Sequence, residues 1–201
     1  MHITDFSLDF FSLEGKRAIV TGGNTGLGQG FALALAKAGA DIYVPGLYAD
    51  GGETAELVRA EGRRYEELAI DITEPGAPAA AVAGCVETLG SVDILVNSAG
   101  ISRIADVTEF GRAQWDPMVA VNLTAAFEMA HESAKHMIAQ GSGKIINIAS
   151  LFAFLGGLGS PAYAATKHGI AGFTKAYADE LGAHGIQVNA IAPGYFATRI
   201  T

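Results

Sequence analysis

Three side chains in the last third of the chain could move a proton together. Tyr163 follows Ser150 by 13 residues and precedes Lys167 by four. Four residues make about one helical turn, so on a helix Tyr163 and Lys167 would face the same cleft. The pKa of a free tyrosine is about 10, and a nearby ammonium would favour the phenolate. The pattern predicts general acid and base catalysis, although such a pair is also an ordinary exposed helix contact.

A glycine-rich segment near the start of the chain could bind phosphate. It comprises Thr21, Gly22, Gly23, Asn24, Thr25, Gly26, Leu27 and Gly28, between a strand-like and a helix-like stretch. Glycines permit a tight turn, and backbone N–H groups at a helix N-terminus attract a pyrophosphate. The segment is neither a Walker loop nor G-x-G-x-x-G, because Phe31 takes the last glycine position of the latter. We predict a dinucleotide site, with a generic glycine-rich turn as the alternative.

Further polar motifs follow predicted strands or lie on a predicted helix. They are Asp71-Ile72, Asn97-Ser98-Ala99-Gly100, Asn122, and Pro193-Gly194-Tyr195-Phe196-Ala197-Thr198. Each has a plain structural alternative, since Asn can end a strand, Asp can open a helix and Pro-Gly can form a turn. Their order along the chain, together with the serine, tyrosine and lysine, is hard to obtain by chance.

Alternating strand-like and helix-like segments surround these motifs. We expect strands at 17–21, 41–44, 65–70, 94–97, 144–148 and 187–192. We expect helices, which carry apolar residues at helical intervals, at 31–38, 53–61, 77–89, 115–139 and 163–183. Consecutive apolar residues in the strands are typical of a parallel sheet covered on both faces. The prediction is an α/β fold with a doubly wound parallel sheet (Rossmann fold) in three αβα layers.

The composition excludes several classes of protein. Half of the 201 residues are hydrophobic, which is enough for one domain, expected over 1–201. The net charge of -8 disfavours nonspecific binding to nucleic acid or to an anionic membrane. Cys85 is the only cysteine, and the histidines show no metal spacing, so we expect no disulfide and no metal. No signal-peptide pattern or membrane-length apolar run is present, so we expect a cytoplasmic protein.

Together, these motifs resemble the short-chain dehydrogenase/reductase family. The glycine loop has the family's G-x-x-x-G-x-G spacing. Residues 97–100 resemble its N-N-A-G element, with Ser98 replacing the second Asn, and residues 193–198 resemble its P-G-x-x-x-T element. The resemblance spans nearly the whole chain. It implies hydride transfer between a nicotinamide cofactor and a small-molecule alcohol or ketone substrate.

The resemblance implies a role for each motif. Tyr163 would exchange the proton of the substrate hydroxyl, and Ser150 would hydrogen-bond the substrate oxygen. Lys167 would bind the nicotinamide ribose, Asn122 would hold a water in a proton relay, and Asn97 would support the central sheet. The implied cofactor-binding residues are Gly22, Asn24, Thr25, Gly26, Leu27, Gly28, Asp71, Ile72, Asn97, Ala99, Gly100, Tyr163, Lys167, Pro193, Gly194, Phe196 and Thr198.

The sequence favours NAD over NADP as the cofactor. An NADP enzyme would need Arg or Lys near the glycine loop or after the second strand to meet the 2′-phosphate. Asn24 and Thr25 occupy the loop, and Pro45-Gly46-Leu47 ends the strand, so no such cation is visible. The acidic residue typical of NAD enzymes is also missing from that strand end.

Three segments resemble one subgroup, the 2-dehydro-3-deoxy-D-gluconate 5-dehydrogenases, also called 2-deoxy-D-gluconate 3-dehydrogenases. They are residues 25–30, 134–141 and 192–198. This likeness implies a sugar-acid substrate, whereas the apolar residues 151–155 beside Ser150 would suit a less polar one. Two alternatives stay open: a 3-oxoacyl-carrier-protein or other carbonyl reductase of the family, and a cofactor-binding regulatory protein without turnover.

The same resemblance extends to assembly and chain length. It implies a homotetramer in which the two long helices, 115–139 and 163–183, pair across subunits. The alternative to pairing across subunits is that each helix packs only against the sheet of its own chain. It also implies that a segment which closes over the substrate, and a last strand, are missing after residue 201.

Overall fold

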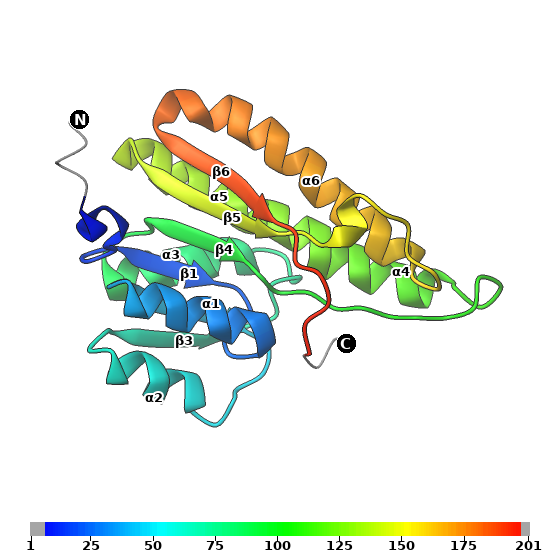
Figure 1. The fold of residues 1–201 in the computed structure, drawn as a ribbon, viewed down its shortest axis with the longest axis horizontal. Coiled ribbons are helices and arrows are strands. Elements are labelled where there is room, and N and C mark those ends of the chain that lie inside the picture. Colours follow the sequence, from blue (N-terminus) through cyan, green and yellow to red (C-terminus); the bar gives the residue numbers. More distant parts are fainter. Residues whose placement is uncertain (1–6, 198–201) are drawn as a thin grey trace.

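The computed structural model describes residues 7–197, which form an open parallel sheet between helices (Figure 1). The strand order is β3-β2-β1-β4-β5-β6, and every neighbouring pair is parallel. The strands are β1 (Arg17–Val20), β2 (Asp41–Gly46), β3 (Tyr65–Ala69), β4 (Ile94–Asn97), β5 (Gly143–Ile148) and β6 (Ile186–Ile191). The order reverses direction between β1 and β4, which confirms the predicted doubly wound α/β fold.

Helices cover the sheet from both sides. They are α1 (Gly26–Lys37), α2 (Glu53–Ala60), α3 (Ala77–Leu89), α4 (Arg112–Val119), α5 (Ala126–Gln140) and α6 (Pro161–Leu181). On one face α1 and α2 pack through apolar residues such as Ala36 and Val58. On the other, α3, α5 and α6 pack through a cluster that includes Cys85, Met129 and Leu181. Burial raises the pKa of the Cys85 thiol to about 12, so this cysteine is a packing residue at neutral pH.

Two predicted helices have different bounds in the structure. Helix α1 begins at Gly26, inside the glycine loop, instead of at residue 31, so its N-terminal N–H groups lie in the loop itself. The segment predicted as one helix over 115–139 is α4, a π-helical segment at Ala120–Ala125 and α5. Apolar periodicity does not reveal one wider turn, because the chain remains helical on both sides of it.

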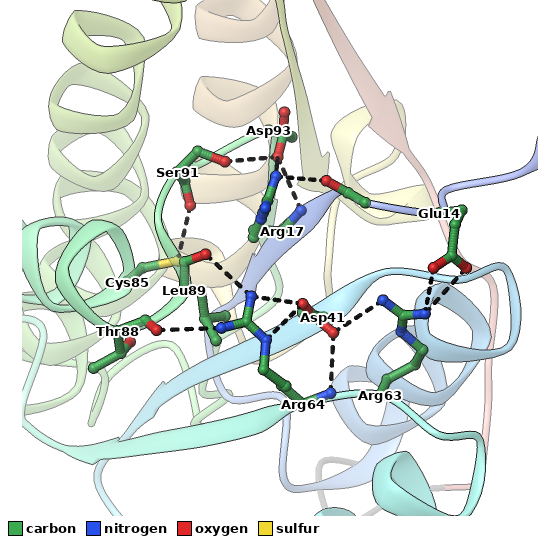
Figure 2. Close-up of polar contacts among 11 residues, drawn as sticks. Glu14, Arg17, Asp41, Arg63, Arg64, Cys85, Thr88, Leu89, Ser91 and Asp93 are labelled. Atoms are coloured by element: carbon green, nitrogen blue, oxygen red, sulfur yellow. Dashed lines mark hydrogen bonds and ion pairs between the residues drawn. The ribbon is translucent and has the colours of Figure 1, made fainter.

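Charged side chains meet at the amino ends of the strands (Figure 2). Asp41, the first residue of β2, accepts hydrogen bonds from Arg63 at 3.2 Å and from Arg64 at 2.9 Å. Arg63 also binds Glu14, while Asp93, just before β4, accepts from the backbone of Arg17 at 2.9 Å. Burial alone would raise the pKa of Asp41, but the hydrogen bonds and charges of the two neighbouring arginines outweigh burial and hold it below its ordinary value. These contacts hold together the amino ends of the strands, at the opposite edge of the sheet from the predicted site motifs.

Two findings on the described part of the chain bear on partners and metals. Between residues 7 and 197, no helix combines the length and hydropathy needed to cross a membrane. Within the same residues, no three His, Cys, Asp or Glu side chains gather in a way that could hold a metal ion.

Candidate active site

A cavity of about 290 Å³ opens at the carboxyl ends of the strands. It extends from the glycine loop between β1 and α1 to the first turns of α6. The predicted site residues in its wall are Gly22, Asn24, Thr25, Gly26, Leu27, Gly28, Asp71, Ile72, Ala99, Gly100, Ser150, Tyr163, Lys167, Pro193, Gly194 and Phe196. Asn97 and Asn122 lie outside the wall, and Thr198 lies outside the described residues.

The glycine loop is shaped by close backbone approaches. Gly22 and Gly26 have φ angles of 62° and 51°, in the left-handed region that favours glycine. A Cβ on Gly28 would lie 2.2 Å from the carbonyl oxygen of Gly22, so no side chain fits there. The Thr21 hydroxyl accepts hydrogen bonds from the N–H groups of Ser98 and Ala99, both at 3.0 Å. The loop after β1 is therefore fixed to the segment after β4, and both face the cavity.

Asn97 lies beneath the cavity, in the last position of β4. Its amide donates to Asn147 Oδ1 on β5 and to the Ala126 carbonyl on α5, both at 2.9 Å. Asn147 in turn donates to Thr174 Oγ1 on α6 at 3.0 Å. All three polar side chains are buried, so this chain of hydrogen bonds joins two strands to two helices under the cavity floor.

Asn122 lies in the π-helical segment between α4 and α5, a feature common at functional sites. Its side chain accepts from the N–H of Ile101 and donates to the carbonyl of Ile101, both at 2.8 Å. It also approaches Thr166 Oγ1 at 3.5 Å. Asn122 therefore connects the loop after β4 to the N-terminal part of α6. Ile101 in that loop lines the cavity, so Asn122 supports the cavity wall from behind.

Ser150, Tyr163 and Lys167 meet at one end of the cavity. Ser150 follows β5 and accepts from the N–H of Phe152 at 3.2 Å, which caps a short 3-10 turn. Lys167 is 5% exposed, donates to the carbonyl of Ile148 at 2.6 Å, and has its Nζ 5.5 Å from the centre of the Tyr163 ring. The predicted helical turn between tyrosine and lysine is therefore present, and both side chains line the cavity.

Burial dominates the proton affinities of this group. It raises the pKa of Tyr163 above its ordinary value, and the hydrogen bond with Ser150 lowers that pKa only in part. Burial also lowers the pKa of Lys167 to about 8. Burial of Tyr163 thus opposes the shift toward phenolate that the sequence predicts from a nearby ammonium.

The structure adds residues to the site that the motifs do not contain. Tyr48, just after β2, and Ile101, just after Gly100, both line the cavity. Arg103 lies two residues beyond Ile101, and its carbonyl accepts from Ser160 Oγ at 2.8 Å, which joins this loop to the start of α6. The only sign of Tyr48, Ile101 and Arg103 in the sequence is that each follows a predicted strand by a few residues. Asp71 is in the wall, but its carboxylate is occupied by Thr73, which lowers its pKa.

Residues 16–201 match the family model described as short chain dehydrogenase. The chain belongs to the short-chain dehydrogenase family. Proteins of this family are oxidoreductases, so the predicted activity is confirmed at this level: a nicotinamide cofactor exchanges a hydride with the carbon of an alcohol or ketone.

Known members of the family are similar over almost all of this chain. YgcW of Escherichia coli (strain K12), an oxidoreductase named as uncharacterized, is 63% identical over 98% of this chain and 75% of its own length. The 2-dehydro-3-deoxy-D-gluconate 5-dehydrogenase of the same strain is 48% identical over 96% of this chain and 77% of its own. A solved structure assigned as a 2-deoxy-D-gluconate 3-dehydrogenase from Agrobacterium tumefaciens has a TM-score of 0.85 at 47% identity, covering 94% of this chain and 75% of that one.

The cofactor prediction is corrected by two of these short-chain dehydrogenases. The Agrobacterium structure contains bound NADP. So, at low occupancy, does that of an assigned NAD(P)-dependent gluconate 5-dehydrogenase from Beutenbergia cavernae, with a TM-score of 0.89 at 38% identity over 95% of this chain and 76% of that one. The expectation that NAD is favoured over NADP is wrong. The prediction rested on the absence of an Arg or Lys near the glycine loop and after β2, but neutral N–H and hydroxyl groups can also bind a phosphate.

Proposed function

We propose that this protein transfers a hydride between NADP and a hydroxyl or keto carbon of a sugar acid of the deoxy-gluconate type. The observation that carries the proposal is the single cavity that runs from the glycine loop to Ser150, Tyr163 and Lys167. A phosphate-binding turn and a proton donor in one cavity are what a dinucleotide-dependent dehydrogenase needs.

The cavity suits a dinucleotide on steric grounds. The missing side chain at Gly28 leaves the loop backbone open, and the N-terminus of α1 directs N–H groups there. Thr25, Gly26 and Leu27 would hold the pyrophosphate, Asp71 and Ile72 the adenine, and Pro193, Gly194 and Phe196 the nicotinamide end. A bound nicotinamide supplies or accepts the hydride. Beneath these residues, Asn97 keeps the ends of β4 and β5 in register.

Tyr163 is the acid of the proposed reaction and Ser150 its partner on the substrate oxygen. In ketone reduction the phenol donates its proton to that oxygen, and in alcohol oxidation the phenolate takes it back. When Tyr163 gives up its proton, a negative charge develops on its oxygen. The Lys167 ammonium stabilises that charge, since its Nζ lies 5.5 Å from the centre of the phenol ring. Asn122 positions the loop at Ile101. We also propose that Asn122 binds the water molecule of a proton relay that leads to Lys167.

Arg103 is the residue we assign to the carboxylate of a sugar acid. Its guanidinium is exposed and donates to the Ala113 carbonyl at 3.0 Å, which leaves other N–H groups free for an anion. None of the ion pairs among the described residues includes it, whereas nearby Arg112 pairs with Asp116. The assignment draws on the names of the relatives, which act on gluconate derivatives. Phe152, two residues after Ser150, packs edge-on against Tyr163 with ring centres 5.9 Å apart.

The expected homotetramer has support in the two long helices. Phe127 and His131 on α5 meet Phe173 and Tyr177 on α6 in an aromatic cluster. Phe127 is 43% exposed, which is unusual for a large apolar side chain in the middle of such a cluster. We propose that a second copy covers it. Light scattering at micromolar concentration would give a tetramer mass if so, and a monomer mass would reject the proposal.

The cytoplasmic location and the segment after residue 201 stay predictions. The relatives are longer than this chain, which spans 75% and 77% of two of them.

The test is a substrate panel that follows nicotinamide absorbance with NADP(H) and with NAD(H). Turnover is expected on 2-dehydro-3-deoxygluconate or gluconate, faster with NADP(H) than with NAD(H). Preferred turnover of a 3-oxoacyl thioester would replace the substrate assignment. Cofactor binding without turnover on any alcohol or ketone would favour the regulatory alternative.

A matched pair of variants tests the carboxylate assignment. Arg103→Gln removes a charge-assisted hydrogen bond and is expected to raise KM for the sugar acid about 10- to 100-fold. It should leave KM for a neutral polyol unchanged, and Arg112→Gln should change neither value. An equal effect of Arg103→Gln on both substrates would show that the charge does not recognise the carboxylate.

A further inference from the structure

The Asn24 amide is held by two acceptors outside the glycine loop. Its Nδ2 donates to the Tyr48 carbonyl, in the segment after β2, and to Glu67 Oε1 on β3 at 3.0 Å. The residue is 4% exposed and lies in the cavity wall, as does Tyr48. A primary amide has two N–H groups, so both are used by these partners.

Glu67 is the unusual member of this arrangement. It lies on the outer strand of the sheet, paired in register with Val44 on β2, and its side chain is exposed. No motif or cavity wall contains it. Glu67 nevertheless reaches the loop that lines the proposed phosphate site, across 43 residues of sequence.

These contacts determine which end of the amide faces the cavity. The Glu67 carboxylate and the Tyr48 carbonyl only accept hydrogen bonds, so an Asn24 amide turned by 180° would set Oδ1 against two oxygens. Such an arrangement leaves acceptors facing one another without a proton and is disfavoured. The amide packs against Gly46, where an added Cβ would be 3.4 Å from Oδ1 and 3.6 Å from Nδ2, and of these two atoms only Oδ1 is left without a hydrogen-bond partner among the described residues. Gly46 is also in the cavity wall, so an acceptor is presented on that side.

We propose that Glu67 is a positioning residue for the cofactor: it fixes the Asn24 amide so that Oδ1 accepts from a ribose hydroxyl at the adenosine end. The same hydrogen bonds tie the segment after β2 to the glycine loop, so two walls of the adenosine end keep their spacing. The inference rests on the proposed use of this cavity by a dinucleotide. It adds a residue on β3, outside the cavity wall, to the residues that shape the cofactor site.

The test measures NADPH binding to the free protein by fluorescence titration, together with kcat and KM. Glu67→Ala is expected to weaken NADPH binding about tenfold, as loss of one such hydrogen bond would, with kcat unchanged. Glu67→Gln keeps an acceptor oxygen and should recover most of the affinity. Glu66→Ala, an exposed neighbour on the same strand, is the matched control and should bind like the natural protein.

A double-mutant cycle separates a positioning role from a general effect on stability. If Glu67 acts through Asn24, Glu67→Ala has no further effect on NADPH binding in an Asn24→Ala background. Additive losses, an unchanged affinity in Glu67→Ala, or an equal loss in Glu66→Ala would each overturn the proposal. A natural protein that binds neither NADPH nor NADH would instead contradict the proposed function, so the two failures are distinguishable.

Discussion

Charged side chains fill the amino edge of the sheet, whereas glycines, amides and hydroxyls line its carboxyl edge. At the amino edge the carboxylates of Asp41 and Glu14 form ion pairs with Arg63 and Arg64 (Figure 2). At the carboxyl edge Lys167 has no carboxylate partner in the described structure and donates to a backbone carbonyl. One edge is therefore closed by its own charges, while the other keeps its proton-active groups available to a ligand.

A large effect is expected at the carboxyl edge, in the dependence of activity on pH. Burial lowers the pKa of Lys167 from 10.5 to about 8, so its ammonium is present below pH 8 and is lost above it. The value of kcat/KM for NADPH in ketone reduction should therefore be level below that pH and fall above it. Lys167→Met, which has no ammonium at any pH, should lower kcat/KM about 100-fold or more.

A lysine variant that keeps its charge controls for this interpretation. Lys167→Arg, if it binds NADPH, should shift the alkaline fall to higher pH, since a guanidinium keeps its proton. An alkaline limb that persists unmoved in Lys167→Arg and in Lys167→Met would assign it to another group.

The next effect is expected at the amino edge, and on stability. Asp41→Ala leaves Arg63 and Arg64 without the carboxylate that they share, and Arg63 is largely buried. The free energy of unfolding should fall by about 2–3 kcal/mol, less than for a fully buried pair because Arg64 is half exposed. Urea unfolding measures the loss. A matching loss of kcat at temperatures where the variant is folded would break the proposed division between the two edges.

The smallest effect should come from the outer end of the same network. Glu14 has 73% of its side chain exposed, so Glu14→Gln removes an ion pair that water already screens. We expect a stability change of about 0.5 kcal/mol and no change in kinetics. A loss as large as that of Asp41→Ala would mean that the network acts as one unit, with Glu14 as essential as the buried member.

Much of the fold could be predicted from the sequence because its patterns are local. Strand-like segments locate all six strands within one or two residues, and helical periodicity locates most helices. The start of α1 was misplaced because the glycines that form its first turn have low helix propensity. The π-helical segment was missed because it changes hydrogen bonding without changing the apolar pattern.

The site was predictable where particular residue types stand at a characteristic spacing along the chain. Ser150, Tyr163 and Lys167 do line one cavity, because the end of β5 and the first turns of α6 are adjacent. Glu67 and Arg103 belong to no such pattern: their contacts depend on strand order and loop paths, which single residues do not encode. The NAD prediction was wrong because it relied on a cation for the 2′-phosphate, whereas neutral donors can also bind a phosphate.

The most direct test of the central claim, that Tyr163 is the proton-transferring group of the carboxyl edge, is Tyr163→Phe. The substitution removes only the phenolic oxygen, so NADPH affinity and the free energy of unfolding should stay close to those of the natural protein. Turnover of the sugar acid should fall by about 1,000-fold. Tyr163→Phe with its NADPH affinity retained and its rate undiminished would contradict the account.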